Sequence, residues 1–154
     1  MTTATTTPDL AVTRVFSAPR ALVYRAFTDP EQFAQWWGPT GNHIPRDEMD
    51  FEVRSGGHQR WTEVYPDRPG AHVRVDFDLA QVVDNELIDG TFRVMGRLPG
   101  GFEPFETKVR IEFHDEANGR TRIEVRQWLA EHLVSPSENG WAEAFAKLDA
   151  VLAA

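Results

Sequence analysis

The stretch that decides the fold is residues 108–129, KVRIEFHDEANGRTRIEVRQWL. Apolar and charged residues alternate through 108–114 and again through 122–126. This period of two is typical of strands that have one buried face and one solvated face. Asn118-Gly119, which lies between them, is a strong signal for a two-residue hairpin turn. The stretch therefore predicts two antiparallel strands of a sheet whose buried face needs a cover.

The same alternation extends upstream through the middle of the chain. It is clearest at Val73, Val75 and Phe77, which alternate with charged residues, and turn-forming residues separate one segment from the next. The predicted strands cover residues 10–16, 48–53, 57–65, 72–83, 86–94, 105–114 and 121–129, with turns at 66–70, 84–85 and 118–119.

Two short helices are predicted after the first strand. Pro19 marks a first helical turn, where a missing backbone N–H is tolerated. Asp29 is a capping residue before Pro30, and Glu31 follows in the turn where the helix dipole favours an anion. Each signal precedes apolar residues at helical spacing.

The C-terminal segment supplies the cover for the sheet. From Ser137 onward a helix is predicted, because Trp141, Phe145, Leu148 and Leu152 recur at intervals of four, three and four residues. The chain thus runs from one strand through two short helices and about six strands to a long helix. This order indicates an α+β fold, in which a curved antiparallel sheet of about six to seven strands wraps around the C-terminal helix.

Length and charge limit the organisation of the chain and its partners. A chain of 154 residues is long enough for one domain, which we place at residues 9–154 after a disordered tail at 1–8. Sixteen basic against 24 acidic residues give a net charge of −8, which disfavours nucleic acid as a partner.

Other classes of protein are disfavoured by what the sequence lacks. Cysteine is absent, so disulfides and thiolate chemistry are excluded. No apolar run reaches the roughly 18 residues of a membrane span. Because residues 1–8 carry no basic start and no apolar block, we predict no secretory signal and expect a cytoplasmic protein.

Several short motifs together resemble the START-like (SRPBCC, Bet v 1-like) superfamily. Within it, the sequence is similar to homologues of the C-terminal domain of the heat-shock protein 90 ATPase activator. The resemblance implies a helix-grip fold, and the superfamily includes ligand-binding proteins, cyclases and interaction modules on that scaffold. The residues that carry it are 14–19, 26–31, 36–39, Asp50, Gly56-Gly57, 121–123 and Gly140-Trp141.

In a helix-grip fold the space between sheet and last helix is often a cavity, and aromatic rings suit its walls as well as a plain core. Gln127 shares the inward parity of Ile123 and Val125, and its buried amide needs a partner. Strict alternation turns Trp128 outward, but a bulge or the end of the strand would turn it inward, and we count it among the cavity residues. The candidate cavity residues are Trp36, Trp61, Phe77, Phe92, Gln127, Trp128, Trp141 and Phe145.

Evidence for catalysis in the sequence is weak. His58 and Arg60 are expected near the cavity mouth, and His58 is the candidate acid–base residue. The five histidines show no metal-ligand spacing, and no serine lies in a nucleophile elbow. We therefore assign no catalytic residue, no metal and no cofactor, and we favour a binding protein over an enzyme.

Three functions remain open from the sequence. The first is binding of a small hydrophobic molecule, whether lipid, polyketide-like or aromatic, in the apolar cavity. The second, implied by the resemblance, is a co-chaperone-like module that contacts a chaperone. The third is a polyketide cyclase- or aromatase-like enzyme, in which the cavity orients a flexible substrate. Oligomerisation is left open as well.

Overall fold

The structure, a computed structural model, describes residues 7–153. Of the predicted tail at 1–8, residues 1–6 lie outside this range. The elements in chain order are β1 (Leu10–Phe16), α1 (Arg20–Thr28), α2 (Pro30–Trp36), the 3-10 turn η1 (Arg46–Glu48), β2 (Asp50–Glu52), β3 (His58–Val64), β4 (His72–Val83), β5 (Leu87–Arg97), β6 (Phe105–Glu116), the 3-10 turn η2 (Ala117–Gly119), β7 (Arg120–Trp128) and α3 (Glu131–Ala153).

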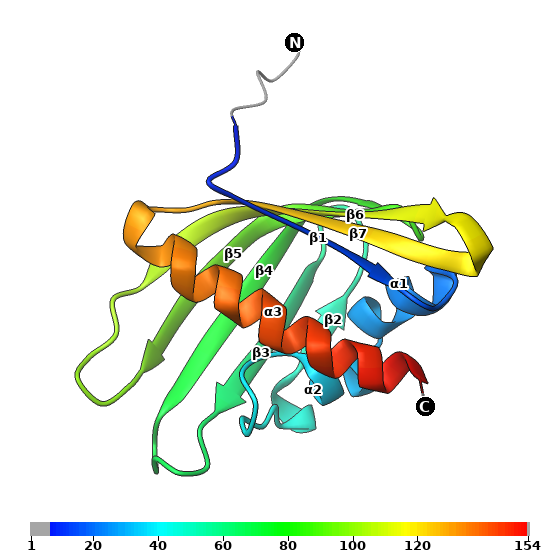
Figure 1. Cartoon of the computed structure of the whole chain (residues 1–154). Coiled ribbons are helices and arrows are strands. Elements are labelled where there is room, and N and C mark those ends of the chain that lie inside the picture. Colours follow the sequence, from blue (N-terminus) through cyan, green and yellow to red (C-terminus); the bar gives the residue numbers. More distant parts are fainter. Residues whose placement is uncertain (1–6, 154) are drawn as a thin grey trace.

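The strands form one curved antiparallel sheet of seven strands in the order β1-β7-β6-β5-β4-β3-β2. Helix α3 runs diagonally across its concave face, and α1 and α2 lie beside the C-terminal half of α3 (Figure 1). This arrangement confirms the predicted α+β helix-grip fold.

The period-two pattern sets the register of the central hairpin. Ile111 pairs with Val125 and Phe113 with Ile123, so apolar side chains meet on the concave face. The turn between the strands is one residue longer than predicted, because Ala117 joins Asn118 and Gly119 in it. Asn118 and Gly119 both adopt positive φ angles, of 65° and 69°, which these two residue types accept readily.

Helix α3 begins at Glu131, six residues before the predicted start at Ser137. The residues of its first turns are exposed or half-buried, so they carry no apolar periodicity from which a start could be predicted. Pro136 lies inside this exposed part of the helix. Its missing N–H therefore leaves a backbone carbonyl that water can reach.

The other predicted strands agree with the structure to within a few residues, with one exception. Of the segment predicted at 48–53, only Asp50–Glu52 forms a strand, because Arg46–Glu48 turns into a 3-10 helix.

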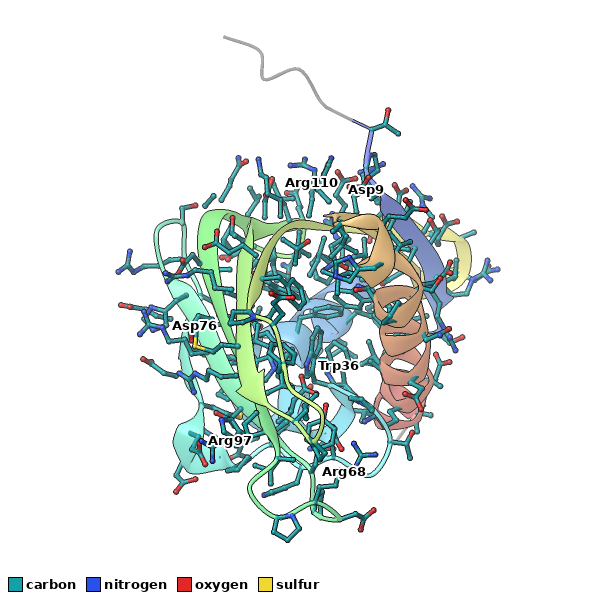
Figure 2. All side chains as sticks on the ribbon, turned by 90° about the vertical axis from the view of Figure 1, so that its left-hand side faces the viewer. Asp9, Trp36, Arg68, Asp76, Arg97 and Arg110 are labelled. Carbon is teal, nitrogen blue, oxygen red and sulfur yellow. The ribbon has the colours of Figure 1, made fainter. Side chains whose placement is uncertain are left out.

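The two faces of the sheet differ sharply in chemistry. In Figure 2, Trp36 lies inside, between the sheet and α3, whereas Asp76 and Arg110 project outward from the sheet. The concave side holds a continuous aromatic core, in which Phe27 contacts Trp36 at 4.7 Å and Phe113 at 5.1 Å between ring centroids. Any binding site on the apolar face must therefore lie where this packing is incomplete.

Candidate functional site

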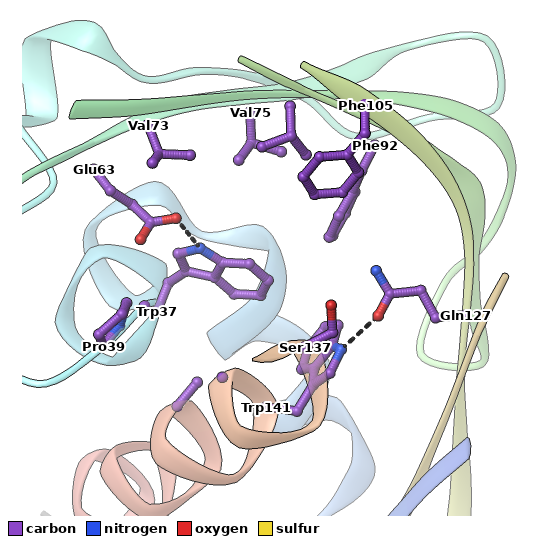
Figure 3. Close-up of a pocket in the computed structure, with 14 residues that line it drawn as sticks. Trp37, Pro39, Glu63, Val73, Val75, Phe92, Phe105, Gln127, Ser137 and Trp141 are labelled. Carbon is purple, nitrogen blue, oxygen red and sulfur yellow. Dashed lines mark hydrogen bonds between the residues drawn. The ribbon is translucent and has the colours of Figure 1, made fainter. Parts of the chain in front are cut away.

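Packing is incomplete between the concave face and the N-terminal half of α3, where a pocket of about 160 Å³ is found (Figure 3). Four α3 residues at i, i+3, i+4 and i+7 form one wall, and the inward-facing residues of β3 to β7 form the other. The lining residues are Trp37, Gly38, Pro39, Glu63, Val73, Val75, Phe92, Val94, Phe105, Gln127, Ser137, Gly140, Trp141 and Ala144.

Gln127 provides a hydrogen-bond donor at one end of the pocket. Its side chain is 4% exposed, and its Oε1 accepts a 2.9 Å hydrogen bond from Trp141 Nε1. An indole N–H can only donate, so the amide oxygen must face Trp141 and the amide nitrogen must point away. Figure 3 shows this nitrogen directed into the pocket. Within residues 7–153 no group accepts a hydrogen bond from it.

Glu63 contributes a buried carboxyl to the same pocket. Its Oε2 accepts a 3.1 Å hydrogen bond from Trp37 Nε1, and the residue is 7% exposed. Burial raises the pKa of Glu63 above its ordinary value, although Trp37, Asn42, Lys147 and Trp61 act in the opposite direction. The amide nitrogen of Asn42 and the indole nitrogen of Trp61 are buried without a hydrogen-bond partner. The carboxyl is thus one of three polar side chains, with Gln127 and Ser137, in an otherwise apolar lining.

Lys147 on α3 fixes the segment that borders the pocket near Glu63. Its Nζ donates to the backbone carbonyls of Trp37 and Pro39, at 3.3 and 3.4 Å. Burial lowers the pKa of Lys147, while the charges of Glu143 and Glu63 raise it. The contact ties the helix to the loop after α2 and holds the Trp37 ring against the pocket.

The predicted cavity residues are divided between the pocket and the core. Phe92, Gln127 and Trp141 line the pocket. The other inward-facing rings are buried among one another and do not line it; Phe77, for example, packs behind Phe92 with centroids 4.6 Å apart. These core residues are Trp36, Trp61, Phe77 and Phe145.

The structure corrects the expectation for Trp128. Strand β7 pairs with β6 in continuous register up to the pair Lys108 and Trp128. Without a bulge, strict alternation holds to the last residue, so Trp128 shares the outer face with Arg126 and is half-buried there. It does not line the pocket.

The expectation for His58 and Arg60 at the cavity mouth is also wrong. On β3 these two residues alternate with Gln59, Trp61 and Glu63, whose side chains are buried on the concave side. They therefore lie on the opposite face of the sheet from the pocket. There His58 Nε2 is 3.0 Å from an oxygen of Asp50, and Arg60 lies 3.6 Å from the same oxygen.

Two pocket residues that carry polar groups, Trp37 and Glu63, were not among the predicted cavity residues. Trp37 presents its indole to Glu63 at the pocket wall. Glu63 itself was not singled out. The sequence does carry a signal for Glu63. It lies two residues after Trp61 and four after Gln59 on the same strand, so all three side chains point to the buried face. A buried acid at such a position is a candidate functional group.

A second cluster of titratable groups lies on the outer face of the sheet. Oxygen and nitrogen atoms of Glu112, His114 and Glu124 lie within 4.8 Å of one another. Arg126, however, bridges both carboxylates at 2.9 Å, and Arg110 contacts Glu112 at 2.7 Å. Arginine charge already neutralises these carboxylates, so the cluster is an ion-pair network across neighbouring strands.

No helix within residues 7–153 is long and apolar enough to cross a membrane.

Comparisons with known proteins agree with this architecture. Protein CV1439 from Chromobacterium violaceum has a TM-score of 0.76 and 23% identity, covering 93% of this chain and 96% of that chain. An AHSA1 protein from Silicibacter pomeroyi has a TM-score of 0.74 and 23% identity, covering 94% and 96%. DynU16, from the dynemicin biosynthetic locus, has a TM-score of 0.66 and 22% identity, covering 93% of this chain but 46% of its own.

At these identities the solved structures establish the fold alone. A comparison with curated proteins gave no match. Residues 17–153 match the family described as Activator of Hsp90 ATPase homolog 1-like protein. The match covers almost the whole described chain and confirms the resemblance found in the sequence. The chain therefore belongs to the Activator of Hsp90 ATPase homolog 1-like family, within the START-like superfamily.

Proposed function

We propose that this protein binds a small hydrophobic molecule in the pocket between the sheet and α3. The observation that carries the proposal is an unfilled space of about 160 Å³ whose walls are mainly valine, phenylalanine and tryptophan. Burial of apolar ligand surface against such walls is favourable by about 25 cal/mol per Å². The volume is close to that of a cavity of about 150 Å³ that encloses one benzene molecule. A ligand with a single ring or a short chain therefore fits it.

Native and denaturing mass spectra of the purified protein test this proposal. We expect a discrete extra mass that is lost on denaturation, or that appears after incubation with single-ring aromatic compounds. Ala144→Leu fills the pocket from α3 and should abolish this extra mass. Ala146→Leu is the matched control, because Ala146 is exposed on the same helix. A wild-type protein that neither carries nor takes up such a mass would overturn the proposal.

A second candidate, catalysis on the bound molecule, is favoured by Glu63. A buried acid in a pocket, with its pKa raised by burial, has the properties of a general acid or base. The polyketide cyclase- or aromatase-like activity left open by the sequence is of this kind. The pocket volume of about 160 Å³, however, is below the roughly 300–1,000 Å³ of typical sites for larger ligands. It accommodates one ring. An enzyme should lose turnover in Glu63→Gln by a far larger factor than the loss of affinity for substrate.

The family description also supports a co-chaperone-like role at heat-shock protein 90. The exposed large apolar side chains of the described chain, Val15, Leu22, Val83 and Met95, lie on four different elements. Val83 pairs with Leu87 near the turn between β4 and β5, whereas Met95 pairs with Arg74 near the other end of these strands, so these two do not share one apolar docking patch. Stimulation of the ATPase of a cognate chaperone by the wild-type protein would favour this role over ligand binding, above all if Ala144→Leu stimulated equally.

A further inference from the structure

We propose that the preferred ligand is an uncharged single-ring compound with two polar groups, a hydrogen-bond acceptor that meets Gln127 and a hydroxyl or amine donor that meets Glu63. The inference rests on the proposed function and names the class of molecule that the same pocket selects. It follows from which atoms of the two side chains are already engaged within the protein.

At the Gln127 end, the protein leaves a donor without a partner. Trp141 occupies the amide oxygen, and this fixes the amide nitrogen on the pocket side. This N–H opens onto the pocket, whose lining is apolar apart from Glu63, Gln127 itself and Ser137, and within residues 7–153 no hydrogen bond joins it to either of the other two. A ligand with a carbonyl, ether or nitro oxygen at this end can accept from it. A purely apolar ligand would leave the N–H unsatisfied and exclude water from it.

At the Glu63 end, the protein leaves an acceptor. A carboxylate can accept about four hydrogen bonds. Trp37 donates one of them to Oε2, and the side-chain nitrogens of Asn42 and Trp61 also face the carboxyl, so these three donors leave room for a further one. Lys147, the nearest cation, donates to two backbone carbonyls instead. A ligand hydroxyl or amine at this end can donate to the carboxyl. A second carboxylate would meet like charge in a buried site, which is unfavourable.

Four probes of nearly equal shape separate the two polar contacts. In 4-hydroxyacetophenone both groups are present; 4-ethylphenol lacks the acceptor, and 4-methylacetophenone lacks the donor. The fourth, 4-hydroxybenzoate, replaces the neutral acceptor with an anion. Isothermal titration calorimetry of the full chain should give the highest affinity for 4-hydroxyacetophenone. Each single deletion should weaken binding by about three- to tenfold, the size of one hydrogen bond, and the anion should bind more weakly still.

Two variants assign each preference to its residue. In Gln127→Met the advantage of 4-hydroxyacetophenone over 4-ethylphenol should disappear. Glu63→Gln keeps an oxygen for Trp37 but turns an amide nitrogen toward the ligand, so the advantage over 4-methylacetophenone should disappear. Gln59→Met is the matched control. Gln59 is also a buried glutamine, but its amide donates to the Phe27 carbonyl at 2.8 Å outside the pocket, and its loss should leave both affinity ratios unchanged.

The outcomes distinguish this inference from the function on which it rests. Equal affinities for the three neutral probes would overturn the inference and leave hydrophobic binding intact. Tighter binding of 4-hydroxybenzoate than of 4-hydroxyacetophenone would also overturn it. Failure of all four probes to bind the wild-type protein would overturn the inference, and the proposed function would fall with it only if the native mass spectra also show no bound mass. Because the affinity ratios are read on the wild type, the test stands even where a variant fails to fold.

Discussion

Trp141 on α3 donates its indole N–H to the side-chain oxygen of Gln127 on β7 across 2.9 Å. Both residues are almost fully buried, at 5% and 4% exposure. The bond joins the long helix to the sheet and at the same time orients the Gln127 amide toward the pocket. One contact therefore contributes to both the fold and the site.

Loss of this bond should destabilise the protein. In Trp141→Phe the Gln127 oxygen is left without its donor, and we expect the free energy of unfolding to fall by about 2 kcal/mol. Urea denaturation measures the change. The double variant Trp141→Phe with Gln127→Met should be more stable than the sum of the single effects predicts, by about 1 kcal/mol, because residues in contact are coupled. Strictly additive effects would contradict the role of the bond.

Gly38 should be less tolerant of substitution than Gly41, although both have positive φ angles, of 84° and 92°. A Cβ at Gly38 would lie 2.9 Å from Glu63 Oε1, whereas a Cβ at Gly41 has no atom within 4 Å. Gly41→Ala should therefore cost only the backbone strain of about 1–2 kcal/mol. Gly38→Ala should cost more, because the Glu63 carboxyl must also move. Equal melting temperatures for the two variants would show that Glu63 does not press against the Gly38 backbone.

Glu63 should make stability fall as pH rises above the ordinary glutamate range. Burial raises its pKa, so the folded protein binds this proton more tightly than the unfolded chain does. The contribution is complete below the ordinary pKa of 4.5 and is lost as pH rises through the folded value. Glu63→Gln stays neutral, so its stability relative to wild type should increase between about pH 5 and pH 8.

Denaturation curves at both pH values measure the difference for Glu63. Glu106→Gln, an exposed site, serves as the control and should show no such trend. A constant difference between Glu63→Gln and wild type across this range would contradict the prediction.

Tyr24 and Tyr65, the two tyrosines of the chain, should resist ionisation. Burial, followed by the nearby Asp84, raises the pKa of Tyr24 from 10.0 to about 12. Burial and Glu63 also raise the pKa of Tyr65. A titration followed by phenolate absorbance should show both residues mainly protonated at about pH 10, where tyrosines of the urea-unfolded chain are half ionised. Half-ionisation of the folded protein at that pH would contradict the burial of both rings.

The outer-face network should contribute a modest, salt-dependent stability. Burial raises the pKa of Glu112, but hydrogen bonds from Arg110 and His114 and the charges of Arg126 and Arg110 outweigh it and lower the pKa overall. Glu112→Gln should therefore cost about 1 kcal/mol at neutral pH and low salt. Because the folded pKa is the lower one, the difference should shrink as pH falls through it. Added salt should shrink it too, and a salt-independent difference would argue against an ionic contribution.

Local sequence patterns are enough to predict the fold and the two chemical faces of the sheet. Alternation in residues 108–114 and 122–126 is local, and a period of two assigns every side chain of a strand to one face. The apolar stripe from Trp141 to Leu152 identified the covering helix for the same reason. The parity of Gln127 placed its amide inside. The exposed first turns of α3 carry no such periodicity, so the predicted start at Ser137 is later than the observed start at Glu131.

Which buried residues line a pocket and which fill the core depends on contacts between distant segments of the chain. Trp36 and Trp141 are both buried aromatic residues at helical positions, yet Trp36 is enclosed by Phe27 and Phe33 while Trp141 borders empty space. That distinction depends on how α2, α3 and β3 pack together, which no local pattern records. The meeting of Glu63 with Trp37, 26 positions apart in the chain, arises in the same way. Strand parity buries the Glu63 carboxyl, but only packing brings it to the Trp37 indole, which lies at the end of α2.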